Sequence, residues 1–149
     1  MSKDLTESNN YKGQIDKFGV VCFVPQGDSM YPFIKNRKQS VCVSKITVPV
    51  KEYDALFYKR NNGDYVLHRV IKVEDNGYLV CGDSQTAPEW VEKENAVGVM
   101  TEFIKGKKTV VIDENYRNKV KKWYKCKVKR GFSILYIKIK RKLKGIFRK

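Results

Sequence analysis

The spacing of apolar residues changes once along this chain of 149 residues, and that change limits the folds it can adopt. Up to about residue 112, short apolar runs alternate with turn signals, which is typical of an all-β sandwich or a partly closed barrel. From Asp113 onward the apolar period becomes helical, which predicts an amphipathic helix. We therefore expect a mainly β protein with a helical tail. The predicted strands are residues 18–24, 40–48, 55–59, 65–73, 77–81, 96–104 and 109–112.

Three segments follow from this pattern. Residues 1–17 are polar, residues 18–112 form one β domain, and residues 113–149 form the tail. Turn residues at 62–64 and 75–77 predict two hairpins, because Asn and Gly tolerate positive φ. The longest apolar runs fall far below the ~20 residues that span a bilayer. We expect neither a signal peptide nor a transmembrane helix, and a cytoplasmic location.

The four cysteines do not form a metal-binding pattern. Cys22, Cys42, Cys81 and Cys126 contain no Cys-x-x-Cys pair, and His68 is the only histidine. Together they make a poor zinc set. We expect free thiols in a reducing compartment, and neither a metal nor another cofactor.

Charge is concentrated in the tail. Residues 115–149 carry 15 of the 31 basic side chains and none of the 16 acidic ones, so they hold the whole net charge of +15. This excludes a uniformly basic protein that coats nucleic acid. The tail forms one helix, or two joined near Gly131. Its apolar stripe either packs on the β body or lies in the plane of an anionic membrane, at its inner face, through residues 116–149. Non-specific nucleic-acid binding is the third alternative, and no motif indicates a specific nucleic acid.

Three short segments hold residue types that can carry chemistry. The segment 27–32, Gly-Asp-Ser-Met-Tyr-Pro, follows a predicted strand and would hold Ser29 at a tight turn. His68 lies in the run 65–73, and residues 81–89 form a loop with several polar side chains. Each segment alone has an ordinary structural explanation, as a turn, a packed histidine and a capped loop.

Their joint occurrence is more specific. In order, GDSMYP, DALFYK, YVLHRVIKV, VCGDS and AVGVM resemble the signal peptidase I and LexA-type serine peptidase superfamily over residues 18–104. The resemblance implies a coiled, mainly β fold with its active site in a surface groove. It is to the members whose general base is histidine, as in the archaeal and endoplasmic-reticulum-type enzymes. It implies that Ser29 is the nucleophile and His68 the general base.

The resemblance leaves the acidic member of the site open. Asp83, in the Gly-Asp motif, is the first choice for orienting the imidazole, and Glu89 is the alternative. Backbone groups around the serine, at Gly27, Asp28 and Met30, would bind the substrate and stabilise the oxyanion, with the Met30 side chain as an apolar wall. An unperturbed histidine pKa of ~6.5 would suit a general base, with a rate that falls below about pH 6 to 7.

The expected function is therefore that of a serine endopeptidase acting on a peptide or protein precursor, as a dedicated maturation peptidase does. The alternative is a catalytically silent β module that binds membrane or nucleic acid through its basic helix. The presence of serine, histidine and carboxylate together favours the enzyme, because a silent module has no physical reason to keep all three.

Overall fold

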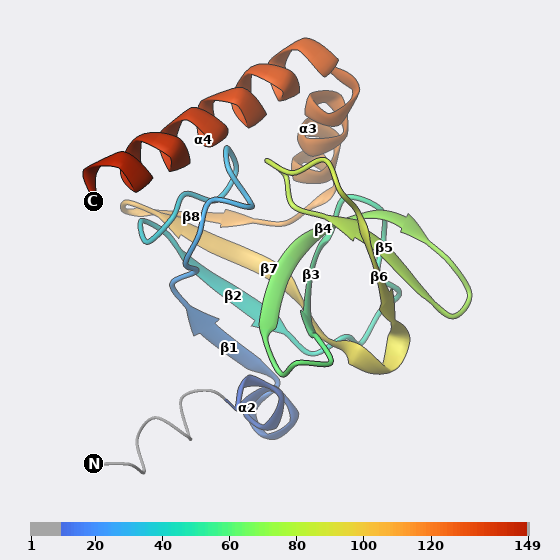
Figure 1. The fold of residues 1–149 in the computed structure, drawn as a ribbon. Coiled ribbons are helices and arrows are strands. Elements are labelled where there is room, and N and C mark those ends of the chain that lie inside the picture. The colour runs from blue at the N-terminus through green and yellow to red at the C-terminus, as the bar shows by residue number, and fades with distance from the viewer. Residues whose placement is uncertain (1–9, 149) are drawn as a thin grey trace, which may run out of the picture.

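The body of the protein is an antiparallel β-sheet that coils on itself, with the helical tail at one end (Figure 1). The computed structural model describes residues 10–148. Neighbouring strands follow the order β1-β2-β7-β3-β4-β5-β6, and β8 pairs with β7. The strands are β1 (Val20–Phe23), β2 (Ser40–Ser44), β3 (Ala55–Lys59), β4 (Tyr65–Val73), β5 (Gly77–Cys81), β6 (Glu89–Glu92), β7 (Ala96–Lys105) and β8 (Lys108–Val111).

The prediction of a mainly β protein is confirmed. Each predicted run contains a strand, and the two predicted hairpins join β3 to β4 and β4 to β5. Strand β6 was not predicted, because Val91 is its only buried side chain and the alternation is too short to recognise. β6 pairs with β5, and it carries Glu89 into the sheet.

The segment predicted only as polar contains a helix, α2 (Tyr11–Phe18). Asn10 caps its first turn by accepting a hydrogen bond from the Gly13 N–H, and Gly19 ends it in the left-handed conformation. Ile15 is its one fully buried side chain. A single apolar anchor gives too little periodicity for the helix to be seen in the sequence.

Two apolar clusters fill the coiled sheet. The smaller one lies around β3, β4, β5 and β6 and includes Leu56, Tyr58 and Val70. The main cluster gathers buried side chains from α2, the strands and the start of the tail. Its buried members are Ile15, Met30, Ile34, Val41, Val43, Ala55, Phe57, Leu67, Val97, Met100, Phe103, Tyr116 and Val120.

The tail forms two helices, α3 (Glu114–Lys125) and α4 (Lys127–Phe147), which meet at Cys126. The predicted joint near Gly131 is wrong, since this glycine lies inside α4. The Asp113 carboxylate caps α3 by accepting a hydrogen bond from the N–H of the third helical residue, which fixes where the tail begins.

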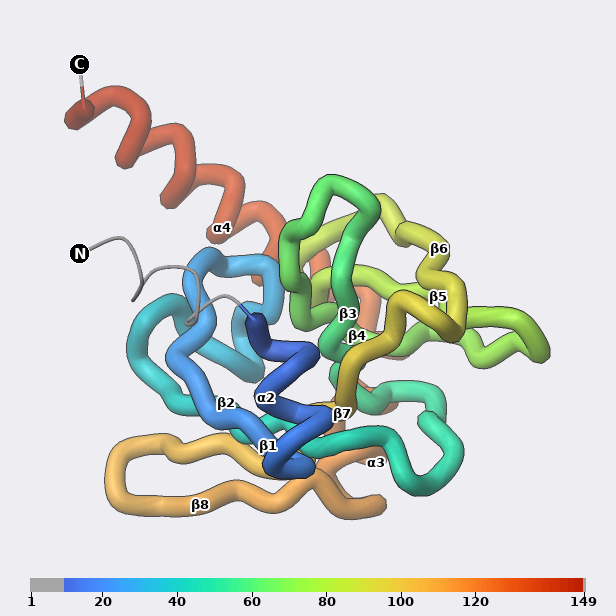
Figure 2. The backbone as a smooth tube through the Cα atoms, turned by 90° about the horizontal axis from the view of Figure 1, so that it is seen from below, coloured from blue at the N-terminus to red at the C-terminus, as the bar shows by residue number. Residues whose placement is uncertain are grey.

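The two tail helices relate differently to the body. Tyr116 and Val120 of α3 belong to the main core, as the alternative of packing on the body predicts. By contrast, Ile137 is the only buried residue of α4. Figure 2 shows α4 running out past the strands. Within residues 10–148, no helix has the length and apolar character needed to span a bilayer.

The expectation of four free thiols is wrong. Cys22 of β1 lies directly opposite Cys42 of β2 in the antiparallel register, and the two form a disulfide. Cys81 and Cys126 are free. Sequence spacing could not show this pair, because the register of β1 on β2 is a tertiary feature. Disulfides persist mainly in oxidising compartments, so the cysteines no longer support a cytoplasmic location.

The core position of α3 can be tested with two identical substitutions. Val120→Ala should lower the free energy of unfolding by about 1 to 2 kcal/mol, because it opens a cavity in a fully buried site. Val128→Ala, on the exposed side of α4, should change it by less than about 0.5 kcal/mol. Urea denaturation measures both values, and equal effects would show that α3 is not part of the core.

Candidate functional site

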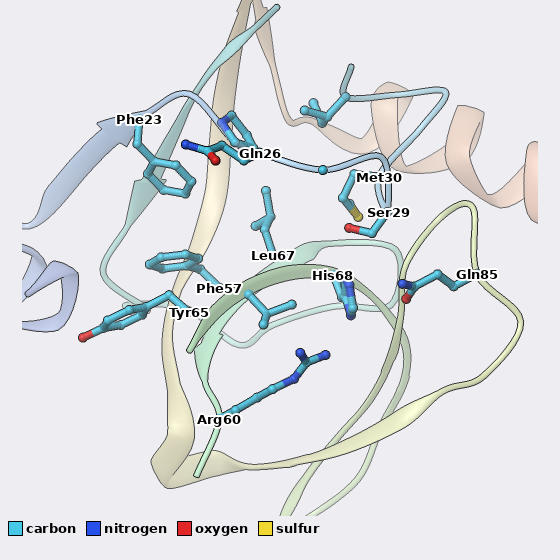
Figure 3. Close-up of a pocket in the computed structure, with 14 residues that line it drawn as sticks. Phe23, Gln26, Ser29, Met30, Phe57, Arg60, Tyr65, Leu67, His68 and Gln85 are labelled. Carbon is cyan, nitrogen blue, oxygen red and sulfur yellow. The ribbon is translucent and has the colours of Figure 1, made fainter. Parts of the chain in front are cut away.

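A pocket of about 290 Å³ brings the predicted nucleophile and the predicted general base together. It lies between the turn that carries Ser29 and strands β3 and β4, and Ser29 and His68 both line it (Figure 3). Apolar side chains, including Phe23, Phe57 and Leu67, form much of the remaining wall. Residues 39 positions apart in the sequence thus face one space.

The Ser29 turn is held by the loop that follows β5. Ser84 donates two hydrogen bonds to the turn: its N–H to the Ser29 carbonyl at 2.9 Å, and its Oγ to the Asp28 carbonyl at 2.6 Å. The loop must approach closely, since a Cβ on Gly82 would lie 2.8 Å from the Ser29 carbonyl oxygen. Gly27 has a φ of +97°, a backbone conformation that residues with a side chain rarely adopt. The GDSMYP and VCGDS segments therefore pack against each other and form one structural unit.

The other residues expected around the nucleophile take separate places. Gly27 and Met30 line the pocket, and the Met30 side chain is buried against it. The Asp28 carboxylate does not line the pocket and forms an ion pair at 3.2 Å with Lys140 of α4. Sequence reasoning missed Lys140 because the partners are 112 residues apart.

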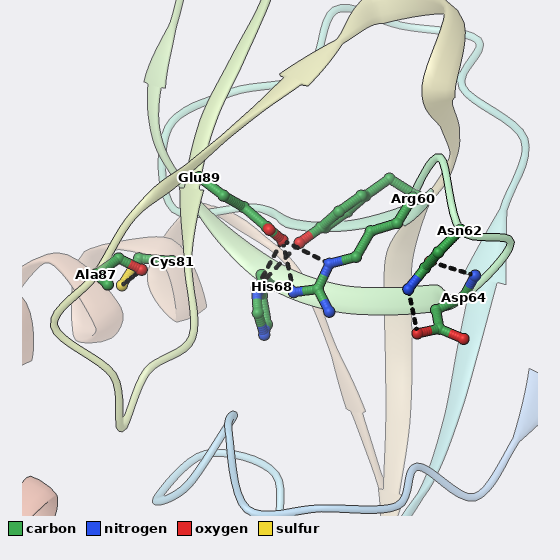
Figure 4. A network of polar contacts seen from close by, with 8 residues as sticks. Arg60, Asn62, Asp64, His68, Cys81, Ala87 and Glu89 are labelled. Carbon is green, nitrogen blue, oxygen red and sulfur yellow. Dashed lines mark hydrogen bonds and ion pairs between the residues drawn. The ribbon is translucent and has the colours of Figure 1, made fainter.

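His68 is almost completely buried, and its Nδ1 faces two polar groups. Tyr58 Oη lies 3.1 Å from Nδ1. Glu89 Oε1 lies 3.7 Å from the same nitrogen (Figure 4). A general base needs Nε2 unprotonated. In that tautomer the Nδ1–H donates to Tyr58 Oη, so this contact can fix the ring. Tyr58 was not predicted, since β3 is buried on both faces and nothing in its sequence marks the tyrosine.

The pKa of His68 is far from its ordinary value. Burial lowers it, and the nearby positive charge of Arg60 lowers it further, to about 4. The expectation of an unperturbed pKa is therefore wrong. The imidazole is neutral well below pH 6, which is the form that a general base requires.

Glu89 is shared between the histidine and an arginine. Arg60 donates to Glu89 Oε1 at 2.9 Å from Nη2 and at 3.3 Å from Nε. Burial raises the pKa of Glu89. Glu89 therefore lies beside the His68 imidazole, as expected if it rather than Asp83 orients the ring. Arg60 binds the same carboxylate. Arg60 was not predicted, because it follows β3 and meets Glu89 only through the fold.

Asp83, the first choice for orienting His68, has other partners. It is fully buried, and its two carboxylate oxygens accept from Arg69 Nε at 3.1 Å and from Arg69 Nη2 at 2.7 Å. Tyr124 Oη of α3 donates to Oδ1 at 2.7 Å. Burial lowers the pKa of Arg69, but Asp83 together with Tyr116 and Tyr124 outweighs burial and raises that pKa above its ordinary value. Asp83 therefore fastens β4 and α3 to the loop that holds the Ser29 turn.

Within residues 10–148, no hydrogen bond joins Ser29 to His68, although the two share the pocket. No protein-family model matches the chain, and no curated protein is significantly similar to it. The arrangement offers a hydroxyl and a buried neutral imidazole at one pocket, with the Glu89 carboxylate next to the imidazole. Such a set can carry out nucleophilic acyl transfer.

The different partners of the two carboxylates predict different effects on stability. Asp83→Asn should lower the free energy of unfolding by about 3 kcal/mol or more, because it leaves the buried Arg69 charge without its counter-ion. Glu89→Gln should cost less than about 1 kcal/mol, since that site is partly exposed. Urea denaturation at pH 7 compares them, and equal losses would contradict the structural role of Asp83.

The lowered pKa of His68 predicts an acid-sensitive stability. The unfolded chain binds a proton near pH 6.5 and the folded chain only near pH 4, so the neutral histidine stabilises the fold above pH 6.5. This contribution is lost as the pH falls from 6.5 towards 4. Between pH 7 and pH 5 the free energy of unfolding of the wild type should fall by about 2 kcal/mol more than that of the His68→Gln variant. Denaturation at the two pH values measures it, and identical losses would refute the shift.

Proposed function

We propose that this protein is a serine endopeptidase of the signal peptidase and LexA type, with Ser29 as nucleophile and His68 as general base. The observation that carries the proposal is that the predicted nucleophile and the only histidine line one pocket. The coiled antiparallel sheet supports it, since the sequence resemblance implies such a fold. Within it, Glu89 and Tyr58 hold the Nδ1 side of the imidazole.

The chemistry uses these residues in a fixed order. His68 Nε2 takes the Ser29 Oγ proton as Oγ attacks the peptide carbonyl and its π electrons move to oxygen. When the C–N bond breaks, the imidazolium gives that proton to the leaving amine, and an acyl-serine remains. Water then attacks the acyl group in the same way and frees the serine. The Nδ1 proton stays on the His68 ring throughout and is donated to Tyr58 Oη, with the Glu89 carboxylate close by.

Substrate binding follows from the pocket and the turn. Ser29 and Met30 are the first two residues of the turn, and their backbone N–H groups are the candidate oxyanion donors. The apolar wall around Phe23 and Phe57 fits an apolar side chain of the substrate next to the cleaved bond. A peptide or protein precursor that presents such a residue in an extended segment is the substrate class, consistent with a maturation peptidase.

A serine-directed fluorophosphonate probe tests the proposal without a known substrate. The probe should label the protein at Ser29, and Ser29→Ala should abolish labelling. His68→Ala should slow labelling by about 10³-fold or more, because the hydroxyl loses its base. Ser133→Ala, on half-buried α4 surface, is the matched control and should label normally. The modified residue is mapped by mass spectrometry.

Two results would contradict the enzyme. Labelling that persists in Ser29→Ala would show that another residue reacts. Absence of labelling in the folded wild-type protein, with native circular dichroism, would favour the silent β module that acts through its basic helix.

A further inference from the structure

Helix α4 presents a row of apolar side chains to solvent. Six of them follow one another at intervals of three or four residues, so they lie on one side of the helix. Each is 50–69% exposed. This outer stripe consists of Val128, Phe132, Leu135, Ile139, Leu143 and Ile146.

The outer stripe faces away from the protein. At about 100° per residue, Ile137 lies roughly opposite the middle of the stripe, and it is the buried residue of α4. On the inner side Arg130 donates to the Gln85 carbonyl at 2.6 Å, and Lys140 pairs with Asp28. Because the inner side already packs on the body, the stripe is not an unfinished core contact.

Basic residues border the outer stripe. Lys142 lies on one side of it along the helix surface and Lys129 on the other. The helix has no acidic residue, and neither has α3 after Glu114. A surface that is apolar in the middle and positive at both margins matches the interface of an anionic bilayer, where acyl chains lie beneath negative headgroups.

Other occupants fit this surface less well. A second copy would bring two tails of like charge together, with no acidic residue from 115 to 149 to offset the repulsion. A nucleic acid would satisfy the lysines but would leave the apolar stripe in water, since phosphates line its surface. The bilayer satisfies both components at once.

We propose that α4 docks in the plane of an anionic lipid bilayer through its outer stripe, with Lys129 and Lys142 at the headgroups. Only α4 takes part, since α3 belongs to the core. The docked helix keeps its inner contacts, from Lys140 to Asp28 and from Arg130 to the Gln85 carbonyl. The pocket that Ser29 lines therefore stays close to the bilayer surface. This proposal does not depend on the peptidase function.

Co-sedimentation of the full-length protein with vesicles tests the docking. Vesicles of phosphatidylcholine with phosphatidylglycerol should bind it at least tenfold more strongly than phosphatidylcholine alone, and 0.5 M NaCl should weaken binding. The variant Phe132→Gln/Ile139→Gln/Leu143→Gln should bind at least tenfold more weakly. Glutamine keeps the helix propensity, which circular dichroism verifies.

The matched control removes apolar side chains of similar exposure elsewhere. Phe18→Gln/Val48→Gln/Val111→Gln lies on the β body and α2, and it should bind vesicles within twofold of the wild type. Equal binding by the two triple variants would overturn the proposal. Wild-type binding that does not increase when phosphatidylglycerol is added to the vesicles would overturn it as well. Binding to duplex DNA tighter than to vesicles, and insensitive to the outer stripe, would overturn it in favour of a polyanion site. A wild-type dimer that the stripe variant dissociates, without vesicle binding, would overturn it in favour of a second copy.

Discussion

The buried ion pair between Arg69 and Asp83 holds together the parts of the chain that form the site. Two charges are tolerated in a core only when their hydrogen-bonding groups are satisfied. Asp83 therefore accepts from Arg69 at both oxygens and from Tyr124, and Arg69 also donates to the Tyr53 carbonyl. Because Arg69 follows His68 directly and Asp83 directly precedes Ser84, which holds the Ser29 turn, this ion pair fixes the position of β4 relative to Ser29.

The Ser29 turn has its own backbone hydrogen bonds, from the Tyr31 N–H to the Asp28 carbonyl and from the Ile34 N–H to the Met30 carbonyl, and the Gly82 to Ser84 loop adds two more. Ser84 donates to two successive carbonyls of the turn, and Gly82 allows the approach. The Gly82 to Ser84 segment therefore acts on the Ser29 turn through the fold, although the two are far apart in the sequence. Glycine gives access, aspartate anchors the loop in the core, and serine holds the turn. Asp83 thus acts on the position of Ser29 through the loop, while Glu89 lies next to the His68 imidazole.

The sequence predicted the strands well, because alternation and turn residues are local signals. It also singled out Ser29 and His68 from their motifs. It could not decide between Asp83 and Glu89, since that depends on which side chain reaches the imidazole across β5 and β6. The Cys22 disulfide and the Lys140 ion pair were likewise invisible, because both need the register or packing of distant segments. Of the tail alternatives, packing on the body is correct for α3, while α4 leaves its stripe exposed, so that membrane binding stays a prediction.

Helix α4 connects the two proposals through its inner side. Lys140 pairs with Asp28, the residue before Ser29, and the same helix carries the outer stripe, so the proposed docking of α4 would place the bilayer one ion pair away from the Ser29 turn. Lys140 is one-third exposed, and an anionic surface would compete with Asp28 for its charge. If docking changes the strength of this ion pair, linkage requires the reverse effect as well: a substrate that closes the Ser29 turn must change membrane affinity by the same factor. The Lys140–Asp28 ion pair therefore gives the two proposals a physical coupling, although each can be tested without the other.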